Sequence, residues 1–231
     1  DNKQMTIMSY NDNNYSRGVN PTTPMLFDVA ALQTLYGVNG NSSTATNGVF
    51  AFDGTKNYLQ TLWSTSGNDT IDLTGTTRGS AVNLNAGTYS NIDVTNTAGG
   101  TLYSGQRNVA IAFGAKINNV TLSGATNVAD TVTVNGAFKT GSFDVINSFD
   151  AAADKIVLKK SLFGGLSGTA NIEFGAAATK TNTRIVVNTT TGEVFYDADG
   201  RGKGVAKKIA QYSAIAIGSL ALTGKNFAIA G

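Results

Sequence analysis

The chain has 231 residues, of which 41% are apolar, 14% are charged and 27 are glycine, and it contains two prolines but no histidine or cysteine. This composition is too apolar for a disordered chain and too rich in turn-forming residues for a helical bundle, so it favours one or two domains of all-β or solenoid architecture. The lack of cysteine excludes disulfides and thiolate metal sites, and suits export from a bacterium.

The first predicted element is a helix over residues 24–36. Apolar residues recur there at spacings of three or four, as a helix with one buried face requires: Met25, Leu26, Val29, Leu32, Leu35 and Tyr36. Thr22 or Thr23 is the expected cap, and Gly37 the expected end. The polar stretch 40–48 then predicts a loop at a domain boundary.

Short strands separated by turns are predicted from there on. Their spacing of roughly ten residues is typical of β-sandwiches and β-solenoids. The predicted strands are 49–52, 70–73, 81–84, 109–113, 120–122, 131–134, 144–149, 155–158, 184–188 and 193–196. The last two flank a Thr-Thr-Thr-Gly turn ending at Gly192 and predict a β-hairpin, because glycine accepts the positive φ that such turns need.

The distribution of charge and apolar residues argues against two classes of partner. Between positions 155 and 208 nine basic residues accompany four acidic ones, but they alternate with strand residues and are interpreted as a solvated face, so no nucleic acid partner is expected. The apolar tail at 214–222 is short and interrupted, so no membrane span is expected. The first residues lack the pattern of a removable export signal, and the missing initiator Met suggests an excised chain.

Several motifs in the same order resemble the serralysin family of secreted bacterial zinc proteases, which are metzincins. They are MTIMSY at 5–10, TPMLFDVAALQTLYG at 23–37, GNDTIDL at 67–73, VNLN at 82–85 and NVAIAFG at 108–114. The stretches FDVI at 143–146, DKIVL at 154–158 and YDADG at 196–200 are similar to C-terminal segments of repeats-in-toxin exoproteins. The resemblance implies that residues 1–40 end a metzincin catalytic domain, with its Met-turn and a helix. Residues 41–231 would then form a mainly β region, a β-roll, β-solenoid or β-sandwich, with degenerate calcium repeats.

The resemblance implies that Met8 is the turn methionine beneath the zinc of the parent protease and that Tyr10 can approach that zinc. On a purely structural interpretation the two are core and rim residues of a loop. The zinc ligands and catalytic glutamate of the family lie in an upstream H-E-x-x-H-x-x-G-x-x-H motif, and a lone phenol cannot replace imidazole ligands. The chain by itself is therefore predicted to have no catalytic residue, and zinc is expected only with the N-terminal protease fragment as a partner.

Calcium in the family is held by glycine-rich turns, with an Asp and backbone carbonyls as hard oxygen ligands. The best match here is SGNDTID at 66–72, which offers Asp69, followed by a stretched turn that offers Asp130. Ser64 stands where relatives commonly have a calcium-binding Asp, and the loop 44–48 lacks the usual pattern. The alternative for both carboxylates is a turn Asp that accepts backbone amides, and few or no calcium sites are expected.

Asp197 and Asp199, followed by a glycine, resemble half of a calcium loop. No further carboxylate follows at the required spacing, and Lys203 and Lys207 would oppose an ion. A tight loop between strands is the alternative for this pair.

The leading hypothesis is the C-terminal region of a serralysin-like metalloendopeptidase, which supports folding and type I secretion into the extracellular medium. The family implies an uncleaved signal for the type I secretion apparatus near the end, and residues 212–231 are compatible with one. A column of apolar residues is expected to drive folding by burial: Val82, Leu84, Ile111, Phe113, Leu122, Val132 and Val134. Two alternatives are an adhesin-like β-solenoid that binds glycans or proteins, and one fragment of a nicked protease that is still active with its N-terminal partner.

Overall fold

The computed structural model describes residues 1–12, 18–92, 105–125, 128–135, 143–214 and 222–231. It is mainly β, with one α-helix, α1 (Leu26–Tyr36), and short 3-10 turns at Thr169–Asn171 and Gly224–Asn226. The strands are β1 (Val49–Asp53), β2 (Gln60–Leu62), β3 (Thr70–Gly75), β4 (Ala81–Asn83), β5 (Thr88–Ser90), β6 (Val109–Ile111), β7 (Asn119–Thr121), β8 (Thr131–Thr133), β9 (Asp144–Phe149), β10 (Lys155–Lys159), β11 (Ile172–Phe174), β12 (Ile185–Asn188), β13 (Glu193–Tyr196), β14 (Lys207–Ala214) and β15 (Phe227–Ala230).

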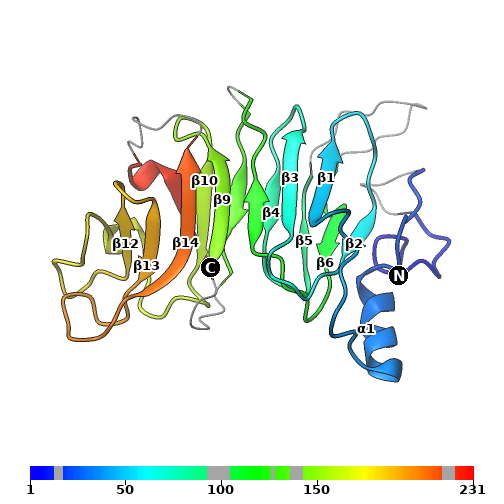
Figure 1. The fold of residues 1–231 in the computed structure, drawn as a ribbon, viewed down its shortest axis with the longest axis horizontal. Coiled ribbons are helices and arrows are strands. Elements are labelled where there is room, and N and C mark those ends of the chain that lie inside the picture. The colour runs from blue at the N-terminus through cyan, green and yellow to red at the C-terminus, as the bar shows by residue number, and fades with distance from the viewer. Residues whose placement is uncertain (13–17, 93–104, 126–127, 136–142, 215–221) are drawn as a thin grey trace.

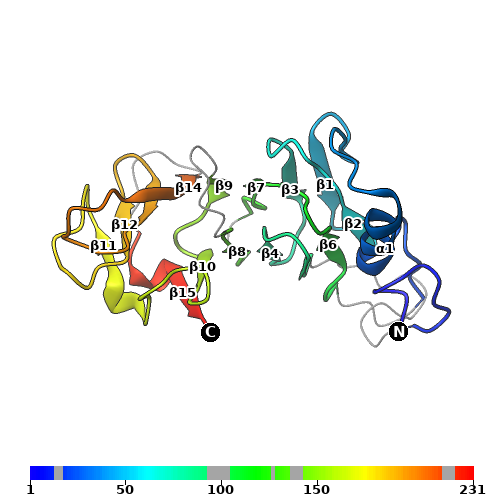
Figure 2. The same ribbon diagram turned by 90° about the horizontal axis from the view of Figure 1, so that it is seen from below.

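The strands form two facing layers (Figures 1 and 2). One layer is an eight-stranded sheet in the order β1-β3-β7-β9-β14-β13-β12-β11. The other layer contains a four-stranded sheet, β15-β10-β8-β4, and a three-stranded sheet, β2-β6-β5. The long runs of parallel pairing between strands far apart in sequence are those of a β-roll, which confirms the predicted mainly β class.

Parallel pairing stacks the apolar side chains in register. Ile71 of β3 lies beside Val120 of β7, which lies beside Ile146 of β9. In the opposite layer Val82, Val132 and Ile156 are aligned in the same way. All of these side chains are buried between the layers, so the alternation within each short strand places one face in a common core.

The predicted column of apolar residues is right except at Phe113. Its other members are buried, whereas Phe113 is 42% exposed. Strand β6 ends at Ile111, two residues earlier than predicted. The Phe113 ring lies outside the core against Gly87, at a position that leaves no room for a Cβ there.

The C-terminal third combines antiparallel with parallel pairing. β12 and β13 form the predicted hairpin, with Ile185 paired to Tyr196 and Asn188 to Glu193. Gly192 ends the turn with a φ of 76°, as expected. β14 then pairs antiparallel with β13 and parallel with β9, which joins the hairpin to the roll.

The helix begins later than predicted and buries less of its apolar face. Its N-cap residue is Met25, because Thr23 is engaged elsewhere, its Oγ1 accepting the Thr61 N–H at 2.8 Å. Met25 and Leu26 are buried, but Leu32, Leu35 and Tyr36 are exposed. The periodicity thus identified the helix correctly, while only its first turn reaches the core.

Candidate functional site

The N-terminal turn is tied to the helix by the carboxylate of Asp28. Its Oδ1 accepts the Thr6 hydroxyl at 2.5 Å, and its Oδ2 accepts the backbone N–H groups of Ile7 and Met25, both at 2.8 Å. Phe27 N–H donates to the Met5 carbonyl at 3.1 Å. The turn and the start of α1 therefore form one hydrogen-bonded unit.

That unit is also bonded to the β region. The Tyr89 hydroxyl donates to the Gln4 carbonyl at 2.9 Å, and burial, the largest cause, raises the pKa of this tyrosine to about 12. The side-chain amide of Gln33 on α1 donates to the Phe113 carbonyl at 2.9 Å. The orientation of the turn is consequently set by contacts with β5 and with the chain after β6.

The two residues singled out from the sequence, Met8 and Tyr10, face solvent. Met8 is 78% exposed and Tyr10 96% exposed, so the interpretation of Met8 as a core residue is wrong. The anchoring contacts come from Thr6 and Ile7, which precede Met8 in the turn. The turn therefore presents both side chains outward.

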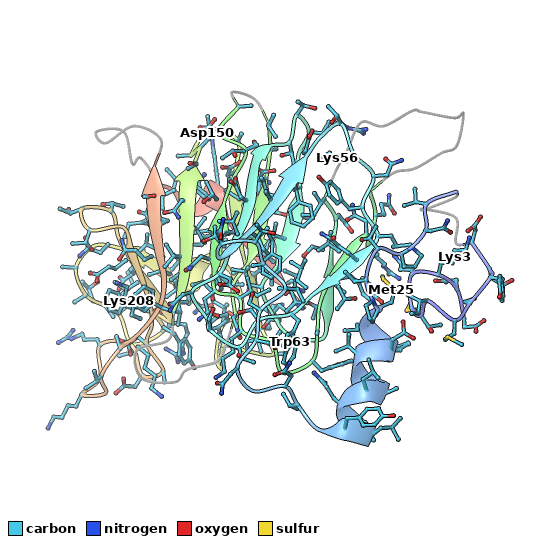
Figure 3. The ribbon with its side chains drawn as sticks, turned by 45° about the vertical axis from the view of Figure 1, so that its right-hand side comes forward. Lys3, Met25, Lys56, Trp63, Asp150 and Lys208 are labelled. Atoms are coloured by element: carbon cyan, nitrogen blue, oxygen red, sulfur yellow. The ribbon has the colours of Figure 1, made fainter. Side chains whose placement is uncertain are left out.

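Exposed apolar side chains also lie on α1, which projects beyond the edge of the sheets (Figure 3). Leu35 is 73% exposed and Tyr36 is 82% exposed. Beside the helix lies a groove of about 280 Å³, whose lining includes Pro24, Val29, Leu32, Tyr36 and Trp63. Exposed apolar residues gathered in one place mark an interaction surface rather than ordinary surface scatter.

Asp69 lies directly before β3 and is surrounded by serine hydroxyls. Ser43 donates to its Oδ2, and Ser64 and Ser66 add further side-chain hydrogen bonds. Burial raises the pKa of this carboxyl, but the hydroxyl donors outweigh burial and the net pKa lies below the ordinary value. The negative charge of Asp69 is thus stabilised by hydrogen bonds from hydroxyl groups. These donors take the place that a bound cation would have.

Asp130 belongs to a ladder of hydrogen-bonded polar side chains that the sequence patterns did not predict. Ser80, Asp130, Asp154 and Asn226 each lie directly before a strand of the four-stranded sheet, β4, β8, β10 and β15. Ser80 N–H donates to Asp130 Oδ1 at 2.7 Å, and Asp130 N–H donates to Asp154 Oδ1 at 2.9 Å. Asn226 completes the ladder by donating to the Asp154 carbonyl at 3.2 Å.

Both carboxylates of this ladder are occupied by backbone donors. The second oxygen of Asp130 accepts the Ser123 N–H at 3.0 Å, and that of Asp154 accepts the Asp150 N–H at 2.8 Å. Burial raises the pKa of Asp154 to about 6, and it raises the pKa of Asp144, at the start of β9, to about 8. A repeated pattern could have identified Asp154: ADTVTV at 129–134 and ADKIVL at 153–158 both place Asp directly before a strand.

Asp197 and Asp199 lie in the loop between β13 and β14. Asp199 N–H donates to Asp197 Oδ1 at 3.2 Å, and Asp199 Oδ2 accepts the Gly204 N–H at 3.0 Å. That amide bond is the main reason why the pKa of Asp199 lies below its ordinary value. Asp197 lines a cavity of about 290 Å³ walled mainly by alanine and glycine, with Val186 and Phe195.

The donor sets at these positions do not fit a metal ion as they stand. Calcium takes six to eight oxygen ligands, as a rule including several carboxylates, and within the described ranges no three Asp, Glu, His or Cys side chains form a group that could hold a metal. A zinc ion would need imidazole or thiolate ligands, and the sequence has neither histidine nor cysteine. In the part of the chain that the structure describes, no helix is long and apolar enough to cross a membrane.

Comparison with known proteins shows that the chain is similar to the C-terminal part of serralysins. Residues 27–191 match the family model described as Peptidase M10 serralysin C terminal. The chain is 33% identical over 134 residues to Serralysin of Photorhabdus laumondii and 31% identical to Serralysin of Proteus mirabilis. It is also 33% identical to Serralysin C of Dickeya chrysanthemi. The matches cover 52% of this chain and 25–26% of each relative, so the chain spans about a quarter of the relatives' length.

Proposed function

The chain belongs to the peptidase M10 serralysin C-terminal family, and from this premise we propose that it forms the C-terminal region of a secreted, extracellular serralysin-like zinc metalloendopeptidase. In this proposal residues 1–40 complete the catalytic domain, and residues 41–231 form the β-roll region that supports folding and type I secretion. The rest of the protease is the partner of this chain.

The observation that carries the proposal is the apolar surface at the N-terminal end. Met8, Tyr10, Leu35 and Tyr36 are largely exposed, although the turn and helix that carry them are held firmly by Asp28 and Tyr89. A rigid scaffold that presents apolar side chains is what a docking surface needs, because little ordering cost opposes association. The unmatched three quarters of the relatives would supply the part that covers it.

The zinc of this proposed protease is held by the partner portion, because this chain offers no imidazole. When bound, zinc would polarise a substrate carbonyl and activate a water molecule. Met8 and Tyr10 are proposed to lie near it, with the exposed phenol of Tyr10 free to turn toward the metal once the portion is docked.

Calcium is proposed to bind at few or no positions of this chain. Serine hydroxyls around Asp69 and backbone amides around Asp130 and Asp199 occupy the carboxylate oxygens that a calcium ion would need. The β-roll is then held by hydrogen bonds and by the apolar core, without the help of a cation.

A reconstitution experiment tests the docking part of the proposal. The portion of Photorhabdus laumondii Serralysin that precedes the matched segment is mixed with this chain, and association is measured by calorimetry and proteolysis by casein hydrolysis. We expect a complex that retains zinc and cleaves casein. Leu35→Asp should abolish the complex, because it places a charge in the apolar interface, whereas Val205→Asp, an exposed apolar position at the other end of the molecule, should not. Absence of association would overturn the docking proposal.

Secretion is tested separately. A reporter protein fused to the N-terminus of the chain is expressed in a bacterium that carries a type I secretion apparatus. We expect the fusion in the medium and the unfused reporter inside the cell. Retention of both inside the cell would contradict the secretion role, whatever the reconstitution shows.

A further inference from the structure

The loop between β13 and β14 lies at the opposite end of the long axis from α1, at the lower left of Figure 1. The end of this loop and the first two residues of β14 carry the sequence GRGKGVAKK at 200–208. We refer to residues 200–206 of this loop as the basic tip. The proposed docking surface lies at the other end, so a partner at one surface leaves the other accessible.

The basic tip is folded around the carboxylate of Asp199. Besides accepting the Gly204 N–H, Asp199 accepts the Gly202 N–H through its carbonyl at 3.2 Å. A Cβ on Gly202 would lie 1.8 Å from Asp199 Oδ2, and one on Gly204 would lie 2.6 Å from Oδ1. The glycines therefore turn their side-chain positions toward the carboxylate, and Arg201, which precedes Gly202, and Lys203, which lies between the two glycines, are exposed.

A second loop fixes the tip in place. Arg201 N–H donates to the Lys180 carbonyl at 3.0 Å, and Gly200, with a φ of 62°, packs against the same carbonyl and that of Thr181. The loop between β11 and β12 is in turn held by Glu173, which accepts the N–H and hydroxyl of Thr179 at 2.6 and 2.7 Å. The cations are thus displayed on a supported loop.

The carboxylates near the tip are engaged by other donors. Glu173 pairs with Lys180 at 3.6 Å, and Glu193 pairs with Lys208 at 3.1 Å. No ion pair joins Arg201 or Lys203 to a carboxylate within the described residues. Two cations on the tip are therefore available to an anionic partner.

Val205 adds an exposed apolar side chain two residues after Lys203. It is 90% exposed, an unusual position for a β-branched apolar side chain on a loop that is otherwise bonded to its surroundings. Basic residues followed by an exposed apolar residue match the membrane interface, where cations meet lipid phosphates and the apolar side chain enters the boundary with the acyl chains.

We propose that the basic tip binds the surface of membranes rich in acidic phospholipids, through Arg201 and Lys203 to the phosphates and Val205 to the apolar boundary. A nucleic acid is disfavoured, because the tip offers no aromatic side chain for stacking and no strand or helix that would enter a groove. The tip would hold the protein at an anionic surface while α1 faces away from it.

The experiment uses the full chain and vesicles of phosphatidylglycerol and phosphatidylcholine in equal amounts, with pure phosphatidylcholine vesicles for comparison. Sedimentation is expected to show binding to the acidic vesicles only, weakening as salt is raised. Arg201→Gln with Lys203→Gln should lower the partition coefficient at least tenfold, on the order expected for two charges at an anionic surface. Val205→Ser should lower it severalfold without changing its dependence on salt.

The matched control is Lys155→Gln with Lys160→Gln, which removes the same charge from exposed positions elsewhere. It should leave binding within about twofold of the parent chain if the basic tip is the site. An equal loss in both double variants would mean that only net charge matters and would overturn the proposal. So would an absence of binding to acidic vesicles at low salt, or binding to double-stranded DNA at concentrations where vesicles are not bound. Unchanged thermal midpoints in all variants would exclude unfolding as the cause.

Discussion

The backbone N–H of Asp130 donates a 2.9 Å hydrogen bond to the carboxylate of Asp154, so two consecutive coils of the β-roll are joined by a buried side chain. Ser80 and Asn226 extend the same connection to the coils on either side. Because each member lies directly before a strand, the ladder aligns the starts of four strands in the same sheet. Hydrogen bonds here hold the turns of the coils in register.

Replacing Asp154 by alanine should destabilise the fold strongly. The change leaves the N–H groups of Asp130 and Asp150 without their acceptor, and a buried unpaired donor costs about 1–3 kcal/mol each. We expect the free energy of unfolding in urea to fall by about 2–4 kcal/mol. Asp72→Ala, which removes a hydrogen bond to Thr74 near the surface, should cost less than about 1 kcal/mol. Equal costs would mean that the ladder has no special role.

Stability should fall as the pH rises from about 4 to 8. Burial raises the pKa of Asp154 to about 6 and of Asp144 to about 8, whereas both ionise near 3.9 in the unfolded chain. The folded state therefore binds more protons across this window, and each group loses its contribution as the pH rises through its folded pKa. Glu173, whose pKa is lowered to about 2 chiefly by the Thr179 amide, acts in the opposite direction, but only below its unfolded pKa of about 4.3.

The variant Asp144→Asn tests whether Asp144 causes the fall in stability at the upper end of this pH range. An amide keeps an oxygen to accept the Asn135 N–H that Asp144 accepts now, and it does not ionise. Thermal midpoints measured between pH 6 and 8 should decline in the parent chain and stay nearly level in the variant. A decline of equal slope in both proteins would assign the effect to another group.

Calcium should have little effect on the parent chain and a large one after a single substitution. Ser64→Asp places a second carboxylate in the hydroxyl cluster of Asp69. Without calcium the two charges should repel and lower the thermal midpoint. With millimolar calcium the midpoint should recover. Binding adds about 2.7 kcal/mol to the free energy of unfolding when the calcium concentration is a hundred times its dissociation constant.

The chelator control for this prediction uses the unmodified chain. Its thermal midpoint should move by less than about 2 °C when chelator replaces calcium, since a ligand that does not bind cannot stabilise. A strong drop with chelator would show that the parent chain depends on calcium, contrary to the expectation of few or no sites.

Removing the carboxylate of Asp28 should release the N-terminal turn without unfolding the β-roll. Asp28→Ala leaves the Ile7 and Met25 N–H groups without their acceptor, so we expect their hydrogen exchange to accelerate at least tenfold while exchange at Val120 and Val132 stays unchanged. Asp53→Ala removes a carboxylate that accepts from the exposed Thr55 and pairs with the exposed Lys56, and it should change neither. Acceleration across the whole chain would instead mean that the turn is part of the global folding unit.

The apolar periodicities predicted much of the fold, because they report directly which faces are removed from water. β9 and β13 have the predicted bounds, and most other predicted strands differ by one or two residues. The short strands β2, β5, β11 and β15 were not predicted. β14 was not predicted either. Lys207 and Lys208 at its start give it a polar pattern, although Ile209 and Tyr212 are buried.

The sequence by itself determined the family of this chain, its β-rich class and its lack of histidine and cysteine, because these follow from residue types and from patterns within a few residues. Only the tertiary structure decided what each carboxylate does. Asp130 and Asp154 are 24 positions apart, and they become partners only when parallel coils stack β8 against β10. The exposure of Met8 and Tyr10 likewise depends on how Asp28 and Tyr89 orient the turn. Such contacts join residues that are distant along the chain. Local sequence patterns could therefore identify the carboxylates, but they could not predict which residues the carboxylates contact.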